Sequence, residues 1–147
     1  MSIPAAVPQL IEVTTEPFKA VVFDIRRRVF VEEQAVDPEE EYDEYEDSSR
    51  HFLLQHNGIG LATGRFRSTT YGWKIERMAV LADYRAQGFG MLLLQGLLPL
   101  IPNDGRPIYL HAQEHALLFY QKAGFIAQGE RFYEANIPHF KMELSRK

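Results

Sequence analysis

A short glycine-containing stretch, Arg85-Ala-Gln-Gly-Phe-Gly90, is the sharpest chemical signal in the sequence. It lies between a strand that is expected to end near Leu81 and an apolar helix. Two glycines allow a tight turn and a close approach of the backbone to a ligand. Backbone N–H groups at a helix start, with the Arg85 guanidinium, suit a pyrophosphate, although glycines also serve plain turns. A nicotinamide-cofactor fingerprint does not fit, because Leu93 stands where a third small residue is needed.

Two side chains near the C-terminal end of the chain could exchange protons. Tyr120 carries a phenol that could donate a proton to a leaving group. The alternative is a core tyrosine that packs beside Phe119 with its hydroxyl satisfied. His139 titrates near neutral pH and could act as a base, or it could cap the last strand.

Glu76 is a second candidate base. Alternation along an extended strand would place it on one face with Met78 and Val80. It could accept a proton directly or through water. The alternative is a structural carboxylate that pairs with a nearby cation, for which there are three candidates: Arg77, Lys74 and Arg65.

Periodicity predicts the elements that position these residues. Asn57-Gly58 is a hairpin turn signal, prolines at 99 and 102 end a buried helix, and Gly124 closes a later helix. The expected strands are Gln9–Thr14, His51–Gln55, Ile59–Arg67, Tyr71–Leu81, Pro107–Ala112, Phe125–Gln128 and His139–Leu144. The expected helices are Glu16–Phe30, Gly88–Leu100 and His115–Ala123, with a further short helix after the first. This order predicts an α/β (α+β) fold, a mixed sheet with helices on both faces.

The composition argues against several classes of function. The chain has 147 residues, a net charge of −4 and no cysteine. One domain over residues 1–147 is expected, without disulfides or a cysteine nucleophile. No transmembrane helix is expected, and Met1–Leu10 lacks the pattern of a secretory signal, so a cytoplasmic location is expected. Neither nucleic acid nor a membrane is expected as a partner, since the chain is not globally basic.

The charge is unevenly placed. Glu32–Asp47 contains ten of the 20 acidic residues and no Lys or Arg. A solvated face is the ordinary interpretation of such a run, and attraction of a cationic ligand is the functional one. Arg26 could instead pair with this acidic segment, because a planar guanidinium suits carboxylates.

Four stretches together resemble the GNAT superfamily of N-acetyltransferases. The first is Val80–Gly90, with its Arg-x-x-Gly-x-Gly core, which resembles the superfamily's loop for the pyrophosphate of acyl-CoA. The second, from Gln113 to Phe125, is similar to the late helix usually written Asn-x-x-Ala-x-x-Phe-Tyr. The third, Glu134–Met142, and the stretch Ile25–Asp43 resemble the ElaA/YjcF-like branch. The expected element order also matches over nearly the whole chain.

The resemblance implies a mostly antiparallel, twisted sheet of about seven strands with a splay between the fourth and fifth. Acetyl-CoA would lie in that splay as cosubstrate, and no metal is implied. A backbone N–H near Ala79 or Val80 would polarise the acetyl carbonyl, and Tyr120 would be the general acid. The implied cofactor-binding residues are Met78, Ala79, Val80, Arg85, Ala86, Gln87, Gly88, Phe89, Gly90, Gln113 and Phe119.

Three residues depart from the superfamily pattern. Gln113 replaces the commoner Asn, which could shift its hydrogen bonds. Ala86 stands where Gly is frequent, which costs nothing if its φ is negative. Asn136 stands where Gly is usual before Ile-Pro-His, and Asn tolerates a left-handed turn.

The leading hypothesis is an N-acetyltransferase that acetylates a primary amine of a small-molecule or peptidyl acceptor. The acidic segment would wall the acceptor site, and neutralising Glu41 and Asp43 would then raise the acceptor KM. The alternatives are a non-catalytic acyl-CoA binding or sensing module and an acyl-homoserine-lactone-synthase-like acyltransferase. The exposed C-terminal strand pair is compatible with a homodimer.

Overall fold

One seven-stranded sheet runs through the protein. The computed structural model describes residues 7–145. The strands lie in the order β1-β2-β3-β4-β5-β7-β6, and every neighbouring pair is antiparallel except β4–β5. Their bounds are β1 Gln9–Val13, β2 Arg50–His56, β3 Ile59–Ser68, β4 Trp73–Val80, β5 Ile108–Gln113, β6 Phe125–Glu134 and β7 Ile137–Leu144. The expected mixed, mostly antiparallel sheet is confirmed.

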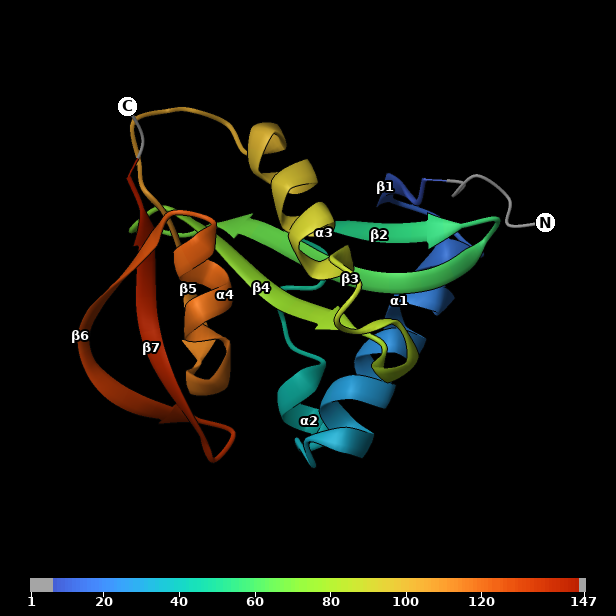
Figure 1. The fold of residues 1–147 in the computed structure, drawn as a ribbon, viewed down its shortest axis with the longest axis horizontal. Coiled ribbons are helices and arrows are strands. Elements are labelled where there is room, and N and C mark those ends of the chain that lie inside the picture. The colour runs from blue at the N-terminus through green and yellow to red at the C-terminus, as the bar shows by residue number, and fades with distance from the viewer. Residues whose placement is uncertain (1–6, 146–147) are drawn as a thin grey trace.

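Helices cover both faces of this sheet (Figure 1). On one face, α1 (Phe18–Arg26) packs Val22 and Ile25 against Leu53 of β2. On the other face, α3 (Phe89–Leu97) and α4 (Leu117–Lys122) enclose the main core, which contains Leu93 and Tyr120. The short elements are the π-helix η1 (Arg27–Glu33), α2 (Pro38–Glu41) and the 3₁₀ turns η2 (Ala82–Tyr84), η3 (Leu98–Leu100) and η4 (Glu114–Ala116).

The sheet divides at β4 and β5. These strands pair in parallel only through Trp73 with Ile108, Lys74 with Tyr109 and Ile75 with Leu110. From Glu76 to Val80, β4 has no strand on this side within residues 7–145 and runs away from the β5-β7-β6 part (Figure 1). The expected splay between the fourth and fifth strands is confirmed.

A β-bulge interrupts β4 beside this splay. Thr63 pairs with Ala79 and Arg65 with Glu76, so β4 contains one more residue than β3 between these pairs. Arg77 takes φ 57° there, an unusual left-handed conformation for a non-glycine residue. The extra residue reverses the alternation. Glu76 therefore lies on the α1 side of the sheet, whereas Met78 packs in the core beside α3; the expectation that they share a face is wrong.

Several element bounds differ from those expected from the sequence. The first helix begins at Phe18 and continues past residue 30 as η1 to Glu33. β6 extends to Glu134, because a bulge between Gln128 and Phe132 carries it through Gly129 and its charged neighbours. No helix among residues 7–145 is long and apolar enough to cross a membrane. Residues 1–6 of the stretch expected to lack a secretory signal lie outside the described part.

Candidate active site

A cleft of about 810 Å³ opens where β4 leaves β5. One wall is the unpaired part of β4, from Glu76 to Val80, and the opposite wall is formed by β5 and α4. The residues of η1 and the acidic segment line the cleft on the α1 side. The lining includes many of the residues that sequence reasoning selected: Glu76, Met78, Ala79, Val80, Arg85, Gly90, Gln113, Phe119, Tyr120 and His139.

The loop Arg85–Gly90 lies at one end of the cleft and leads into α3. Gly88 has φ 83° and open space around the position of an absent Cβ, so the loop presents bare backbone there. Gly90 packs closely, because a Cβ on it would lie 3.3 Å from the Phe119 ring. Ala86 has φ 61°, so the condition under which Ala would be harmless here, a negative φ, is not met. A left-handed Ala costs on the order of 1–2 kcal/mol relative to Gly.

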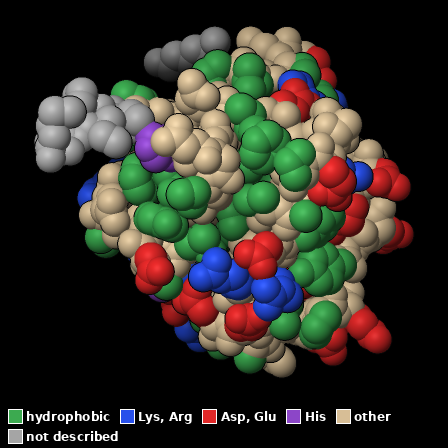
Figure 2. All heavy atoms as spheres, turned by 90° about the vertical axis from the view of Figure 1, so that its right-hand side faces the viewer, with side chains coloured by type: hydrophobic (Ala, Val, Ile, Leu, Met, Phe, Trp, Pro, Cys, Tyr) green, Lys and Arg blue, Asp and Glu red, His purple; other side chains and the backbone are tan. Residues whose placement is uncertain are grey.

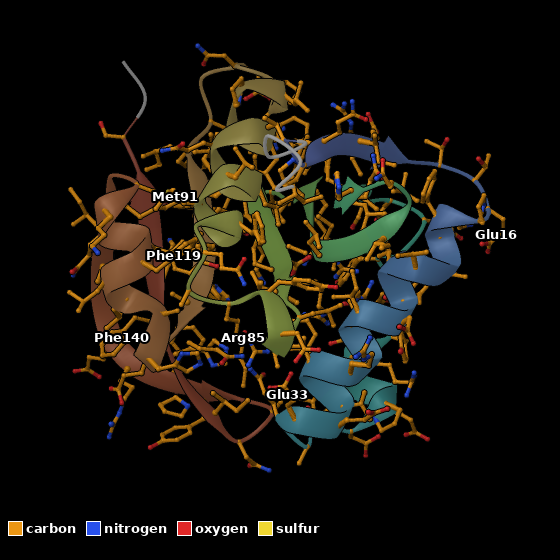
Figure 3. All side chains as sticks on the ribbon, turned by 45° about the vertical axis from the view of Figure 1, so that its right-hand side comes forward. Glu16, Glu33, Arg85, Met91, Phe119 and Phe140 are labelled. Carbon is orange, nitrogen blue, oxygen red and sulfur yellow. The ribbon has the colours of Figure 1, made fainter. Side chains whose placement is uncertain are left out.

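Two side-chain contacts, Arg85 with Glu33 and Gln113 with Gln34, join the end of η1 to both sides of the cleft. These two contacts are here called the clasp. Arg85 donates to both carboxylate oxygens of Glu33 at 2.8 Å, and its Nε donates to the Val80 carbonyl at 2.9 Å. Figure 3 shows Arg85 and Glu33 facing each other from the loop after β4 and from the end of η1. Gln34, the residue after η1, accepts a 2.8 Å hydrogen bond from Gln113 at the end of β5. The clasp thus spans the space between the two strands.

Tyr120 extends from α4 to the cleft. Its ring packs against Phe119 and Phe125, with centroids 5.0 and 5.9 Å away, and the residue is only 8% exposed. Burial raises the pKa of its phenol. The hydroxyl has no hydrogen-bond partner among residues 7–145, although a buried tyrosine usually finds one. An unpaired donor at the cleft is suited to hydrogen bonding with a ligand.

Glu76 is surrounded by cations. Its Oε1 accepts from Arg65 at 2.9 Å and from Arg67 at 2.7 Å, and Lys74 Nζ lies 3.1 Å from Oε2. Burial alone would raise the pKa of Glu76, but these three partners outweigh it and lower the pKa to about 2. A carboxylate with this pKa is a weak proton acceptor at neutral pH. The geometry favours the structural alternative for Glu76 over the role of base.

A buried ion network lies behind this wall. The acidic segment contributes carboxylates, and α1, β3 and β4 contribute guanidinium groups. Its members are Arg26, Glu41, Asp43, Glu46, Arg65, Glu76 and Arg77.

Arg26 and Arg65 form the centre of this network. Both are almost completely buried. Arg26 donates to Glu41 at 2.6 Å and to Glu46 at 2.7 Å, as the pairing alternative expected. Figure 2 shows basic side chains lying directly beside acidic ones on the face that carries α1. Much of the negative charge of the acidic segment is therefore neutralised within the protein.

His139 lies on β7, and its side chain reaches the cleft. Its Nδ1 lies 2.7 Å from the Ile137 carbonyl, and its ring stacks on Phe132. Nε2 lies 3.8 Å from the Glu134 carboxylate. The turn before β7 contains Asn136 at φ 62°, so the expected left-handed turn is confirmed.

Sequence reasoning missed several residues of the cleft. Gln34 and Glu134 belong to the two branch-like stretches, and that membership was the available signal. His111 and His115 are four residues apart, a metal-ligand spacing only if both lie on one helix, but His111 lies on β5 and His115 in η4. Among residues 7–145 no group of three or more acidic or histidine side chains is arranged to hold a metal.

Several features of the cleft fit an acyl-CoA. Gly88 gives a phosphate access to the backbone at the start of α3, and Arg85 adds a positive charge beside it. The unpaired edge of β4 offers backbone groups to the amides of an extended pantetheine arm. Tyr120, whose hydroxyl has no hydrogen-bond partner among residues 7–145, lines the same cleft.

Comparison with known proteins gives a consistent result. The family model described as "Acetyltransferase (GNAT) domain" matches residues 12–146. The Bacillus subtilis protein YjcF, named an uncharacterized N-acetyltransferase, is 36% identical over 82% of this chain and 87% of its own length. The crystal structure of Escherichia coli ElaA superposes with a TM-score of 0.80 at 26% identity, over 93% of this chain and 99% of ElaA. A GNAT family acetyltransferase from Elizabethkingia anophelis, with acetyl-CoA bound, matches with a TM-score of 0.67 at 19% identity, over 94% of this chain and 95% of that one.

Proposed function

The chain belongs to the GNAT acetyltransferase family and is an acyltransferase, and from this premise we propose that it transfers the acetyl group of acetyl-CoA directly to a primary amine. The acceptor is a small molecule or a peptidyl amine. The observation that carries the proposal is the cleft of about 810 Å³ between β4 and β5, with the glycine loop at one end and the Tyr120 hydroxyl inside. Without a cysteine in the chain, transfer does not pass through a cysteinyl acyl-enzyme.

The residues of the cleft have distinct tasks in this proposal. Acetyl-CoA supplies the acetyl group as a thioester. The backbone of Ala86–Gly90 and the Arg85 guanidinium hold the pyrophosphate, which requires Arg85 to leave Glu33. The β4 backbone around Met78, Ala79 and Val80 orients the pantetheine arm and polarises the carbonyl. Gln113 and Phe119 line the other side.

Tyr120 is the proposed general acid. Tyr120 lines the cleft, its hydroxyl has no hydrogen-bond partner within residues 7–145, and its raised pKa keeps the phenol protonated at neutral pH. A protonated phenol can donate to the departing thiolate.

The acidic segment does not indicate that the acceptor is positively charged. Glu41, Asp43 and Glu46 are already paired with arginines. The hypothesis that Glu41 and Asp43 attract a cationic acceptor therefore loses its basis, and these two carboxylates are proposed to support the acceptor wall. Neutralising them is then expected to reduce stability more than it raises the acceptor KM.

Calorimetry with CoA and acetyl-CoA tests the proposal through a matched pair of variants. Gly88 and Gly105 have φ 83° and 88°, and both have open space around the missing Cβ. Glu at either position creates the same backbone strain and adds the same charge, but only Gly88 lies in the proposed pyrophosphate site. Gly88→Glu is expected to weaken CoA binding at least about tenfold, whereas Gly105→Glu keeps the wild-type affinity.

Equal affinity in the two variants would place the pyrophosphate elsewhere. Absence of binding to the wild-type protein would reject acetyl-CoA as cosubstrate. A subsequent screen of amines for CoA release separates the transferase from a CoA-binding module that does not turn over.

A further inference from the structure

His111 and Glu134 form a hydrogen-bonded pair at the point where β4 and β5 part. His111 follows Leu110, which makes the last β4–β5 pair with Ile75. Glu134 ends β6, and its Oε2 lies 2.8 Å from His111 Nδ1. Both side chains line the cleft. The pair therefore lies at the closed end of the splay, level with the start of the unpaired part of β4.

The hydrogen bond fixes the tautomer of His111. Burial alone would raise the pKa of Glu134, but the hydrogen bond from His111 and the positive charge of Lys74 lower it. Glu134 is therefore ionised at neutral pH, and a carboxylate can only accept hydrogen bonds. Nδ1 must carry the proton, so Nε2 of the neutral ring keeps its lone pair. Nε2 of His111 has no hydrogen-bond partner within residues 7–145.

Other ionisable groups surround this pair. Lys141 of β7 stands opposite His111 in the sheet, and its ammonium lies over the Tyr71 and Tyr109 rings. Lys74 and Glu76 of β4 face it from the other wall of the cleft and are paired with each other. His139 approaches Glu134 from β7, with Nε2 3.8 Å from Oε1.

The other two candidate bases are less suited to accept a proton. Glu76 has a pKa of about 2 and three cationic partners. His139 has Nδ1 bound to the Ile137 carbonyl and Nε2 directed at Glu134. His139 thus lies near the carboxylate oxygen of Glu134 that His111 does not contact.

Together these contacts lead to an assignment that rests on the proposed function. We infer that His111 Nε2 is the general base of amine acetylation and that Glu134 is its positioning residue. The amine nitrogen forms a bond to the acetyl carbon as the carbon–sulfur bond breaks. His111 takes one proton from that nitrogen, and Tyr120 gives one to the sulfur. Proton exchange with solvent restores both residues, so the net products are an amide and CoA.

Steady-state kinetics test the base with an amine found in the screen. His111→Gln is expected to lower kcat/KM by about 10²–10⁴-fold and to remove the acidic limb of its pH profile. Glu134→Gln is expected to lower kcat with little change in the acceptor KM and to keep the acidic limb. His56→Gln, on β2 and outside the cleft, is the matched control and is expected to behave as wild type. An unchanged rate and pH profile in His111→Gln would overturn the inference.

A second measurement needs no substrate. Long-range ¹H–¹⁵N spectra of the histidine rings are expected to show His111 as the Nδ1–H tautomer at pH 8, with the signal assigned by its loss in His111→Gln. In Glu134→Gln the preference for this tautomer is expected to weaken. An Nε2–H tautomer in the wild-type protein overturns the inference even if acetyl transfer occurs. CoA binding by His111→Gln, measured by calorimetry, separates this outcome from a failure of the proposed function.

Discussion

The two sides of the cleft use ion pairs in opposite ways. The buried ion network joins α1, the acidic segment, β3 and β4, and its central groups Arg26 and Arg65 have almost no contact with solvent. In the clasp, by contrast, the Arg85 and Glu33 side chains are 44% and 38% exposed. Both contain arginine–carboxylate pairs near 2.8 Å. Burial, rather than distance, separates a fixed wall from a contact that a ligand can replace, because solvent screens and competes for exposed pairs.

Removing the charge of Arg26 is the strongest test of this difference. Arg26→Met keeps the length of the side chain but leaves Glu41 with Arg77 as its remaining partner in the network. We expect the free energy of unfolding to fall by about 3–5 kcal/mol, the usual cost of removing one partner of a buried ion pair. Equilibrium unfolding in denaturant measures this difference in the free energy of unfolding between the wild-type protein and the variant.

The double variant Arg26→Met/Glu41→Met is the control for this prediction. It removes both buried charges and is expected to be more stable than Arg26→Met alone. A loss below about 1 kcal/mol in Arg26→Met, as for an exposed pair, would remove the distinction between the two sides.

Acid should weaken the network at a pH set by Glu76. Its pKa is about 2 in the folded protein, below its ordinary value of 4.5, so its ionised form favours folding. The contribution, about 3 kcal/mol, is present above pH 4.5 and is lost as the pH falls toward 2. Glu76→Gln is expected to flatten the stability profile between these two pH values.

Asp104 offers a surface comparison for the acid experiment. Its pKa is also about 2, chiefly because Arg106 hydrogen-bonds to it, but it lies exposed. Asp104→Asn is expected to change the profile less, and 0.5 M salt should suppress that change. Equal changes for Asp104→Asn and Glu76→Gln at high salt would contradict the prediction.

The smallest expected effect concerns the clasp. Glu33→Gln removes the carboxylate that holds Arg85 and is expected to tighten CoA binding about two- to tenfold, without a measurable loss of stability. Glu32→Gln makes the same charge change one residue away, where the partner is Arg27. Calorimetry of the two variants with CoA compares them. Weaker binding in Glu33→Gln than in Glu32→Gln would mean that the clasp supports the cofactor site.

The order of the strands and helices can be predicted from the sequence better than the contacts between residues that are far apart in the chain. Turn signals such as Asn57-Gly58 and Gly124 place the strands and helices, since glycine and asparagine favour left-handed turns. The glycine loop is recognisable because its residues are adjacent. The clasp is not, because Glu33 and Arg85 are 52 residues apart and Gln34 and Gln113 are 79 apart.

Local irregularities account for the other errors. Arg77 gives no sign in the sequence that it takes a left-handed φ, yet this one bulge moves Glu76 to the opposite face from Met78. The Ala86 conformation is hidden in the same way, because alanine ordinarily avoids positive φ. The regular alternation of side chains along a strand therefore fails beside the cleft, where the bulge in β4 changes which side chains line the wall.

A natural fluorophore lies where the two halves of the sheet join. Trp73, the sole tryptophan, begins β4 opposite Ile108, where the parallel pairing starts. Its indole N–H donates to Asp104 at 3.2 Å, and the Arg106 guanidinium lies 5.0 Å from its ring centroid. Tryptophan emission from the native chain thus arises at a single known place. Because Trp73 precedes Lys74 and Ile75, which line the cleft, a change in its fluorescence on addition of a ligand would report entry into the cleft without any attached dye.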